Sequence, residues 1–267
     1  MELAFSVDLE PNKDGSIDGI RDAMRWFDEV IPRGTVYTTS QIATELPEVV
    51  ESLSEDHEIG VHVHPQEFGH EADDLAALSR DRQRELISQT RKTVAGAAGV
   101  APETLTAFRA GRHKASQTTL DILTDIGFKI DASINVRYRN YMPDTMTVRT
   151  EPFIYNGDLV ELPTTYAQPS KPSRVWARTF PNGNITATAH TLRTDRRGCS
   201  GLRALQWLFK KNDNVVSMYM HPYDAIDYHS DLENNGQEFR DRIKLLFDWS
   251  DHRFVVATDI LTKLTKR

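Results

Sequence analysis

Short apolar runs alternate with helical patterns along the whole chain, and this alternation limits the fold more than any other sequence feature. The runs that fit strands lie near residues 3–8, 34–38, 58–64, 105–109, 128–134, 159–163, 215–221 and 253–257. The helical patterns between them lie near residues 17–29, 41–53, 74–98, 116–126, 201–211, 236–249 and 258–265. Regular alternation of this kind is typical of a parallel sheet covered by helices. The sequence therefore predicts an α/β fold, either a barrel or a doubly wound sheet.

The chain is long enough to form one such fold. It has 267 residues, of which 39% are hydrophobic, and single α/β barrels commonly reach this length. Because no internal repeat or linker interrupts the pattern, we expect one domain spanning residues 1–267. Residues 165–200 have no clear period and are rich in Pro, Thr, Arg and Asn. Loops of that length are usually functional or flexible, so we interpret the segment as an excursion on the substrate side.

Composition limits the possible partners and locations of the protein. The net charge of −7 argues against nucleic acid or an anionic membrane as the main partner. No apolar run reaches the length of about 18 residues that a transmembrane helix needs. The first residues have neither a basic region nor a cleavable apolar segment, so we expect no signal peptide and a cytoplasmic location. Cys199 is the only cysteine and cannot form an internal disulfide. The sequence does not indicate the oligomeric state.

Residues 57–65 read His-Glu-Ile-Gly-Val-His-Val-His-Pro. Alternate residues of a strand share a face, so His62 and His64 are expected to project side by side. Neighbouring imidazoles are unfavourable when both are protonated and favourable when both bind a cation. A polar strand face explains the pair equally well when it is taken alone. The choice depends on whether the rest of the chain supplies further ligands.

Polar side chains also lie at the carboxyl ends of other predicted strands, where parallel α/β folds build their active sites. Asp8 and Glu10 share one face if the chain stays extended, and two carboxylates repel unless a proton or cation lies between them. Arg109 can pair with a carboxylate. Asp131 can orient an Arg or His or form a structural salt bridge. His221 ends its strand and can act as a general acid. Each residue has an ordinary explanation alone, but their convergence favours an active site.

The order of these segments matches one known pattern. The segments in question are 5–10 (Phe-Ser-Val-Asp-Leu-Glu), 35–62, 108–111 (Phe-Arg-Ala-Gly), 127–133, 160–163 (Val-Glu-Leu-Pro), 220–222 (Met-His-Pro) and 254–258. In this order they resemble the motifs of the polysaccharide deacetylase (NodB-homology) family, the family 4 carbohydrate esterases and their relatives. The resemblance runs almost from end to end of the chain. It implies a distorted (β/α) barrel of seven or eight strands.

The resemblance also implies a divalent metal, most often zinc, with Fe, Co or Mn as alternatives, bound by a carboxylate and two histidines. Carried over by position, Asp8 would be the general base and Glu10 and His62 would be metal ligands. Arg109 would position the base, and His221 would protonate the leaving amine. Asp131 falls in the fourth motif and is included among the expected catalytic residues.

The chain departs from the family pattern at three positions. The second ligand histidine usually comes four residues after the first, but Gln66 stands there. Strand geometry favours His64 as the substitute, with His70 as the alternative. The second acid of the first motif is a Glu two residues after Asp8, so the roles of base and ligand could be exchanged between the two. Gly111 replaces the usual Pro of the third motif.

The expected function is metal-dependent removal of an N-acetyl group from an amino sugar or glycan precursor, with release of acetate. Arg112, Tyr166 and Tyr223 are the expected substrate-binding residues. Trp176 and Phe180 in the 165–200 excursion either stack on sugar rings or pack in the core. Two alternatives stay open: hydrolysis of a non-sugar linear or cyclic amide on the same barrel, and a non-catalytic glycan-binding protein.

Overall fold

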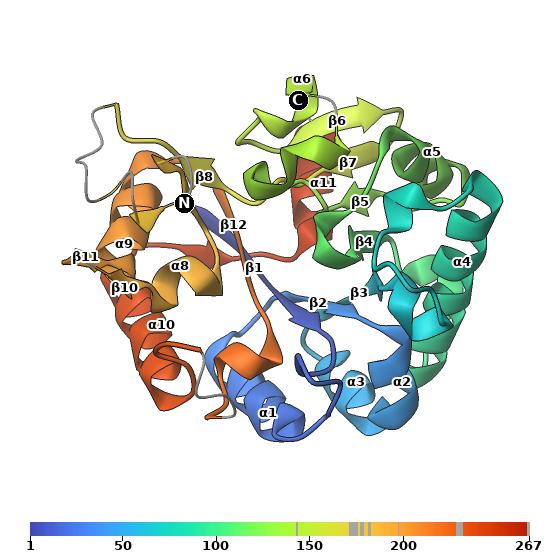
Figure 1. The fold of residues 1–267 in the computed structure, drawn as a ribbon, viewed down its shortest axis with the longest axis horizontal. Helices are drawn as coiled ribbons and strands as arrows, with labels where there is room; N and C mark the ends of the chain where they lie inside the picture. Colours follow the sequence, from blue (N-terminus) through green and yellow to red (C-terminus); the bar gives the residue numbers. More distant parts are fainter. Residues whose placement is uncertain are drawn as a thin grey trace.

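The computed structural model describes residues 1–142, 144–170, 176, 179–180, 183–196, 198–227 and 232–265. Figure 1 shows a curled sheet at the centre, surrounded by helices. Eight strands follow one another in the order β12-β1-β2-β3-β4-β5-β7-β6, and β13 pairs with β1 as a ninth. Their bounds are β1 (Glu2–Leu9), β2 (Thr35–Thr38), β3 (Glu58–Val63), β4 (Ala107–Ala110), β5 (Ile130–Asp131), β6 (Phe153–Asn156), β7 (Leu159–Glu161), β12 (Val215–Met220) and β13 (Arg253–Phe254). All neighbours pair in parallel except β6 and β7, which form an antiparallel hairpin.

The chain that follows β7 brings the sheet round into a barrel. The backbone N–H of Thr165 donates to the carbonyl oxygen of Ser217 in β12 at 3.0 Å. The N–H of Ser217 in turn donates to Thr165 Oγ1 at 2.9 Å. An isolated parallel bridge between Thr188 and Tyr219 extends the same edge. The expectation of a distorted barrel with seven or eight strands is therefore confirmed.

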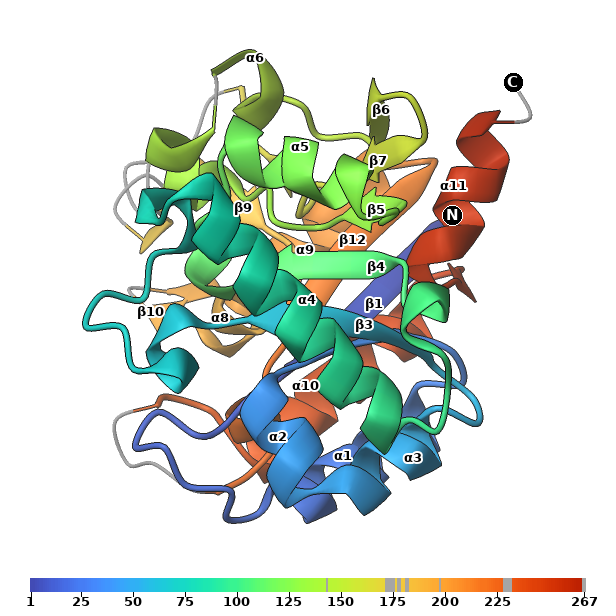
Figure 2. The same ribbon diagram turned by 90° about the vertical axis from the view of Figure 1, so that its right-hand side faces the viewer.

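Amphipathic helices cover the outside of the sheet (Figure 2). The longer ones are α1 (Ile20–Val30), α4 (Arg80–Ala97), α5 (Gln117–Asp125), α9 (Gly201–Lys211), α10 (Gln237–Trp249) and α11 (Ala257–Thr265). The shorter ones are α2 (Ser40–Glu45), α3 (Pro47–Leu53), α6 (Asp144–Thr147) and α8 (Ala189–Arg193). Two small antiparallel two-stranded sheets lie outside the main sheet, β8 (Tyr166–Ala167) with β9 (Ile185–Thr186) and β10 (Asp195–Arg196) with β11 (Cys199–Ser200).

The core forms where the apolar faces of these helices meet the sheet. Helix α1 buries Ile20, Met24 and Phe27, which share one helical face. The ring of Phe27 lies 6.1 Å from that of Phe5 in β1, and Phe247 of α10 contacts Phe5 edge-on at 5.4 Å. Burial of each such side chain stabilises the fold by about 1.5–3 kcal/mol. This packing fixes β1, whose carboxyl end carries the first acidic residues of the site.

Element boundaries differ from the sequence prediction at several places. The pattern over 41–53 forms two helices, because Leu46 leaves helical geometry and Pro47, which lacks an N–H, starts the second helix. The pattern over 74–98 becomes α-helical only after the N-cap Ser79. The strand predicted over 128–134 is limited to β5, and the hairpin strand β6 was not predicted. No helix among the described residues combines the length and hydropathy that crossing a membrane requires.

Candidate active site

A cavity of about 660 Å³ opens at the carboxyl ends of the strands. Its walls come from the segments that follow β1, β3, β4 and β12, so residues far apart in the sequence meet there. Parallel barrels place their reactive groups at this end, because the loops that leave the strands converge on it. Five of the catalytic and metal-binding residues expected from the sequence line the cavity: Asp8, Glu10, His62, His64 and His221.

Three of these side chains point their ligand atoms at one another. Glu10 Oε2 lies 2.7 Å from His64 Nε2 and 3.3 Å from His62 Nε2. The two Nε2 atoms are 3.1 Å apart. Such close lone pairs are unfavourable unless a proton or a cation lies between them. Glu10, His62 and His64 form a group that can hold a metal ion.

The other ring nitrogens determine which tautomers the two histidines adopt. His62 Nδ1 lies 2.8 Å from the carbonyl oxygen of Arg109, and His64 Nδ1 lies 2.7 Å from Asp73 Oδ2. A carbonyl and a carboxylate only accept, so each Nδ1 carries a hydrogen and donates. Each Nε2 is then free to bind a metal, which is the usual arrangement around metal-ligating histidines. Two imidazole nitrogens and one carboxylate oxygen fit zinc, and also non-haem iron.

His64 is held in place by charge and by close packing. Burial opposes its protonation, but the negative charge of Glu10 and the hydrogen bonds with Asp73 and Glu10 outweigh that effect and raise the pKa of His64 to about 10. A proton and a divalent cation therefore compete for the space between Glu10 and His64. Gly111 packs against the His64 ring so closely that a Cβ there would lie 2.7 Å from it.

His70 lies outside this group. Its Nε2 accepts a hydrogen bond from Arg82 Nε at 3.0 Å, and it does not line the cavity. Of the two candidates for the second histidine ligand, the structure brings His64 to Glu10 and His62.

Asp8, which lines the cavity, is paired with the buried Arg109. Arg109 is 1% exposed, and its Nη1 forms an ion pair with Asp8 Oδ1. The guanidinium also donates to Ser6 Oγ at 3.0 Å and to the Ala132 carbonyl at 3.1 Å, and it lies 4.2 Å above the Tyr37 ring. Burial acts to raise the pKa of Asp8, but the positive charge of Arg109 prevails and lowers it. Asp8 therefore stays ionised at neutral pH.

His221 lies close to both carboxylates, Asp8 and Glu10. Its Nε2 lies 3.9 Å from Asp8 Oδ2 and 3.7 Å from Glu10 Oε1. Its Nδ1 lies 3.4 Å from Asp224 Oδ2, and Asp224 forms an ion pair with Arg193 at 2.8 Å. Burial lowers the pKa of His221, but the hydrogen bond with Asp224 and the surrounding negative charges outweigh it, so the net shift is upward. The upward shift favours the protonated form, from which His221 can donate a proton.

Comparisons with known proteins address the fold. No protein-family model and no curated protein matches the sequence. Among solved structures, a protein described as a polysaccharide deacetylase from Mycobacterium smegmatis superposes with a TM-score of 0.61 at 16% identity, covering 98% of this chain and 91% of the other. The chain has the polysaccharide deacetylase fold.

Two further structures share this fold. PuuE allantoinase superposes with a TM-score of 0.62 at 13% identity, covering 98% of this chain and 89% of the other. A mutant of a family 4 carbohydrate esterase pseudoenzyme from Bacillus anthracis, with restored enzymatic activity, gives a TM-score of 0.54 at 10% identity, covering 97% and 67%. At these identities the comparisons establish the architecture, and the chemistry must be argued from the residues of this chain.

Asp131 lies below the cavity of this deacetylase fold rather than in its wall. It is fully buried and accepts a hydrogen bond from Ser133 Oγ at 2.5 Å. Its register partner across β5 and β7 is Glu161, also fully buried. Burial, together with the proximity of the two carboxyls, raises the pKa of Glu161 well above its usual value, and burial raises that of Asp131 to about 6. The hydrogen bonds of Arg109 go to other groups, so Asp131 does not orient Arg109 directly.

The expected substrate-binding residues divide into two sets. Arg112 and Tyr223 line the cavity, and Tyr223 stacks on His221 with ring centroids 4.6 Å apart. Tyr166 does not line the cavity, and its hydroxyl donates to the Val148 carbonyl at 3.1 Å. Trp176 packs against Phe180 and against Trp207 of α9. These two aromatic residues of the excursion are therefore packing groups. Residues 171–175, 177–178, 181–182 and 197 of the same segment lie outside the described residues.

Sequence reasoning missed three residues that shape the candidate site. Asp73 is 7% exposed and orients His64, Tyr37 supports Arg109, and His113 forms part of the cavity wall. Asp73 lies in an acidic loop with no period, so nothing in its surroundings distinguishes it. His113 follows Arg112 directly, and a scan for histidines near the third motif would have found it.

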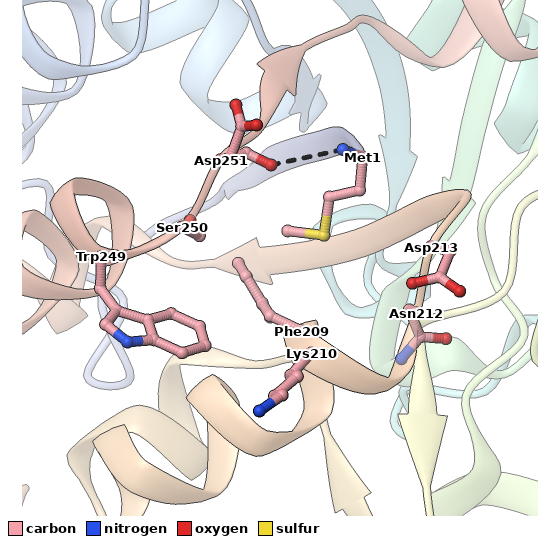
Figure 3. Close-up of a pocket in the computed structure, with 8 residues that line it drawn as sticks. All are labelled: Met1, Phe209, Lys210, Asn212, Asp213, Trp249, Ser250 and Asp251. Atoms are coloured by element: carbon pink, nitrogen blue, oxygen red, sulfur yellow. Dashed lines mark hydrogen bonds between the residues drawn. The ribbon is translucent and has the colours of Figure 1, made fainter.

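A second, smaller cavity lies at the other end of β1. Figure 3 shows its lining, which includes Met1, Phe209 and Trp249. Its volume is about 330 Å³. Neither a histidine nor a glutamate contributes to it, in contrast to the cavity at the carboxyl ends.

Proposed function

We propose that this protein is a metal-dependent hydrolase that removes an N-acetyl group from an amino sugar or glycan precursor and releases acetate. One observation carries the proposal. Glu10, His62 and His64 form a group that can hold a metal ion, and they line the same cavity as two further residues. These are the carboxylate of Asp8, whose pKa is lowered, and the imidazole of His221, whose pKa is raised. Binding alone does not require a base and an acid on either side of a metal site, so this argues against a non-catalytic glycan-binding protein.

The residues of the chain divide the proton transfers between them. Asp8, kept ionised by Arg109, accepts a proton from the attacking water. His221, held by Asp224, donates a proton to the amine nitrogen as the C–N bond breaks. When bound by Glu10, His62 and His64, a divalent cation such as zinc supplies Lewis acidity, which acidifies water and stabilises negative charge on the amide oxygen. Glu10 contacts both histidines whereas Asp8 pairs with Arg109, which supports Glu10 as ligand and Asp8 as base.

Metal content and acetate release test the proposal together. We expect purified protein to hold about one divalent ion per chain and to release acetate from members of a panel of N-acetylhexosamines, N-acetylated oligosaccharides and nucleotide sugars. A chelator should abolish the release. His64→Gln should lose the metal, whereas His70→Gln, the matched control outside the group, should keep it. Wild-type protein without metal above background would overturn the proposal.

The similarity to PuuE allantoinase favours a second candidate, hydrolysis of a non-sugar linear or cyclic amide. The same base, acid and metal group serve that reaction, because any amide carbonyl needs the same activation. Turnover of linear or cyclic amides without acetate release from any N-acetylated sugar would identify this candidate as the correct one.

A further inference from the structure

Arg112 stands in the cavity wall with part of its guanidinium group unused. Its Nε forms an ion pair with Asp73 Oδ2 at 2.7 Å, the same oxygen that accepts from His64. The Asp73 side chain is 5% exposed, whereas that of Arg112 is 60% exposed. Within the described part of the chain, Arg112 makes no other hydrogen bond or ion pair. Its two terminal nitrogens are therefore available to a ligand.

The backbone holds Arg112 in an unusual conformation. Its φ is 51° and that of His113 is 57°, a left-handed region that side-chain-bearing residues rarely adopt. Strained backbone of this kind persists where the surrounding structure enforces it, and it is found most often at ligand and active sites. Here the buried His113 anchors the turn, because its Nδ1 lies 3.1 Å from the Ser133 carbonyl. Arg112 is therefore fixed both through its side chain and through its backbone.

A second cation enters the cavity from another strand. Lys13 follows β1, whereas Arg112 follows β4, and both line the cavity. Lys13 lies 5.5 Å above the Tyr223 ring and has no ion pair among the described residues. By contrast, the acids Asp8, Glu10 and Asp73 each face a cationic or protonatable partner inside the site. Lys13 and the two terminal nitrogens of Arg112 are the cationic groups of the described cavity wall that remain to interact with a substrate.

We propose that Arg112 binds an anionic group of the substrate, a carboxylate or a phosphate, so that the natural substrate is an acidic N-acetylated sugar. This inference rests on the proposed deacetylase function and adds the substrate class. A guanidinium anchored at Nε offers its two terminal N–H groups side by side, the geometry that carboxylate and phosphate oxygens match. Asp73 links this anion-binding residue to the metal ligand His64, so the anionic group lies close to the reacting amide. Lys13 adds positive potential at the entrance.

Acetate release from matched probes tests the substrate class. The probes are N-acetylglucosamine, N-acetylglucosamine 1-phosphate and N-acetylmuramic acid, which carry no charge, a phosphate and a carboxylate. We expect wild-type kcat/KM to be higher for one of the two acidic probes than for the neutral one, and that probe identifies the group. In Arg112→Gln, the ratio of acidic to neutral kcat/KM should fall by about 10- to 100-fold, the range for lost charge-assisted hydrogen bonds. Arg112→Lys, which keeps the charge but loses the fork, should fall between the two.

The control is Arg80→Gln, which removes an exposed Arg that pairs with Asp125 outside the cavity and should leave the ratio unchanged. Equal kcat/KM for acidic and neutral probes in wild type, or an unchanged ratio in Arg112→Gln, would overturn the inference while leaving the deacetylase proposal intact. If no probe releases acetate, calorimetry measures the binding of the same probes to the Asp8→Asn variant and to the same variant with Arg112→Gln added. At least tenfold weaker binding of an acidic probe to the double variant supports the anion site. Equal binding by the two proteins overturns it.

Discussion

Replacing Asp73 by Asn should weaken zinc binding about a hundredfold, although Asp73 is not itself a ligand. One Asp73 oxygen accepts from both His64 Nδ1 and Arg112 Nε, each at 2.7 Å. The carboxylate therefore fixes the ring orientation and the tautomer that leaves His64 Nε2 free for a metal. An Asn amide is neutral, so the negative charge that holds both donors is lost even if the amide oxygen accepts from both. If its NH₂ faces His64 Nδ1, it favours the tautomer with a hydrogen on Nε2, which removes the ligand lone pair.

The size of the effect follows from these contacts. Substitution of residues that orient metal-ligating histidines typically costs 10- to 100-fold in metal affinity. Asp73 is nearly buried and is shared by two donors, so we expect the upper end of that range. A hundredfold loss corresponds to about 2.8 kcal/mol.

Competition with a chromogenic zinc chelator measures the change directly, and thermal melting confirms that the variant is folded. Asp74→Asn is the matched control, because Asp74 caps the turn at Ala77 and pairs with Lys114 but contacts neither histidine. A dissociation constant of folded Asp73→Asn within threefold of the wild-type value would refute the reasoning, as would an equal loss in Asp74→Asn.

Three further predictions concern protons. His221→Gln should lower kcat by about 10²- to 10⁴-fold with zinc content unchanged, as measured by acetate release and metal analysis; loss of the metal would contradict its assignment as the acid. When zinc is saturating, the lowered pKa of Asp8 and the raised pKa of His221 predict that neither group causes kcat/KM to fall between about pH 3.8 and about pH 6.5; a fall within that range at saturating zinc would contradict this. Asp131 and Glu161 have pKa values raised by folding, so the folded state retains protons that the unfolded state releases, and stability falls as pH rises from about 4 through 6 and beyond. Glu161→Gln should therefore raise the melting temperature at pH 8 by a few degrees and flatten its pH dependence; a lower melting temperature with the same pH dependence would disprove the explanation.

The parts of the site that depend on local periodicity were predictable from the sequence. The alternation around His62 and His64 predicts that both side chains project to one side, because side chains of extended chain alternate; His62 lies in β3, and His64 is the extended residue that follows it. The parity of Asp8 and Glu10 follows in the same way, and the strand order of a parallel barrel brings these ends together.

Contacts between distant segments were not predictable in this way. Asp73 reaches His64 from an irregular loop, and Arg193 reaches Asp224 from within the 165–200 segment. Neither segment has a period that indicates which side chain points inward. Tyr166 was expected to bind substrate because it is an aromatic residue of the 165–200 segment. Its hydroxyl instead donates to the Val148 carbonyl, and the residue does not line the cavity. Strand β6 was missed because its burial alternates weakly at the exposed edge of the sheet.

The close packing of Gly111 on His64 connects two departures from the family pattern, which are the histidine at position 64 and the glycine at position 111. A Cβ at position 111 would lie 2.7 Å from the His64 ring and 2.7 Å from the Val63 carbonyl oxygen, and every residue other than glycine, proline included, carries that atom. The histidine that substitutes for the usual ligand therefore fills the space that the usual Pro of this motif would need. Glycine at position 111 accommodates both the His64 ring and the Val63 carbonyl oxygen. A side chain at position 111 would require the backbone at Val63 to shift even if His64 were replaced. Natural sequences with His-x-His on this strand should accordingly carry glycine at the position corresponding to 111.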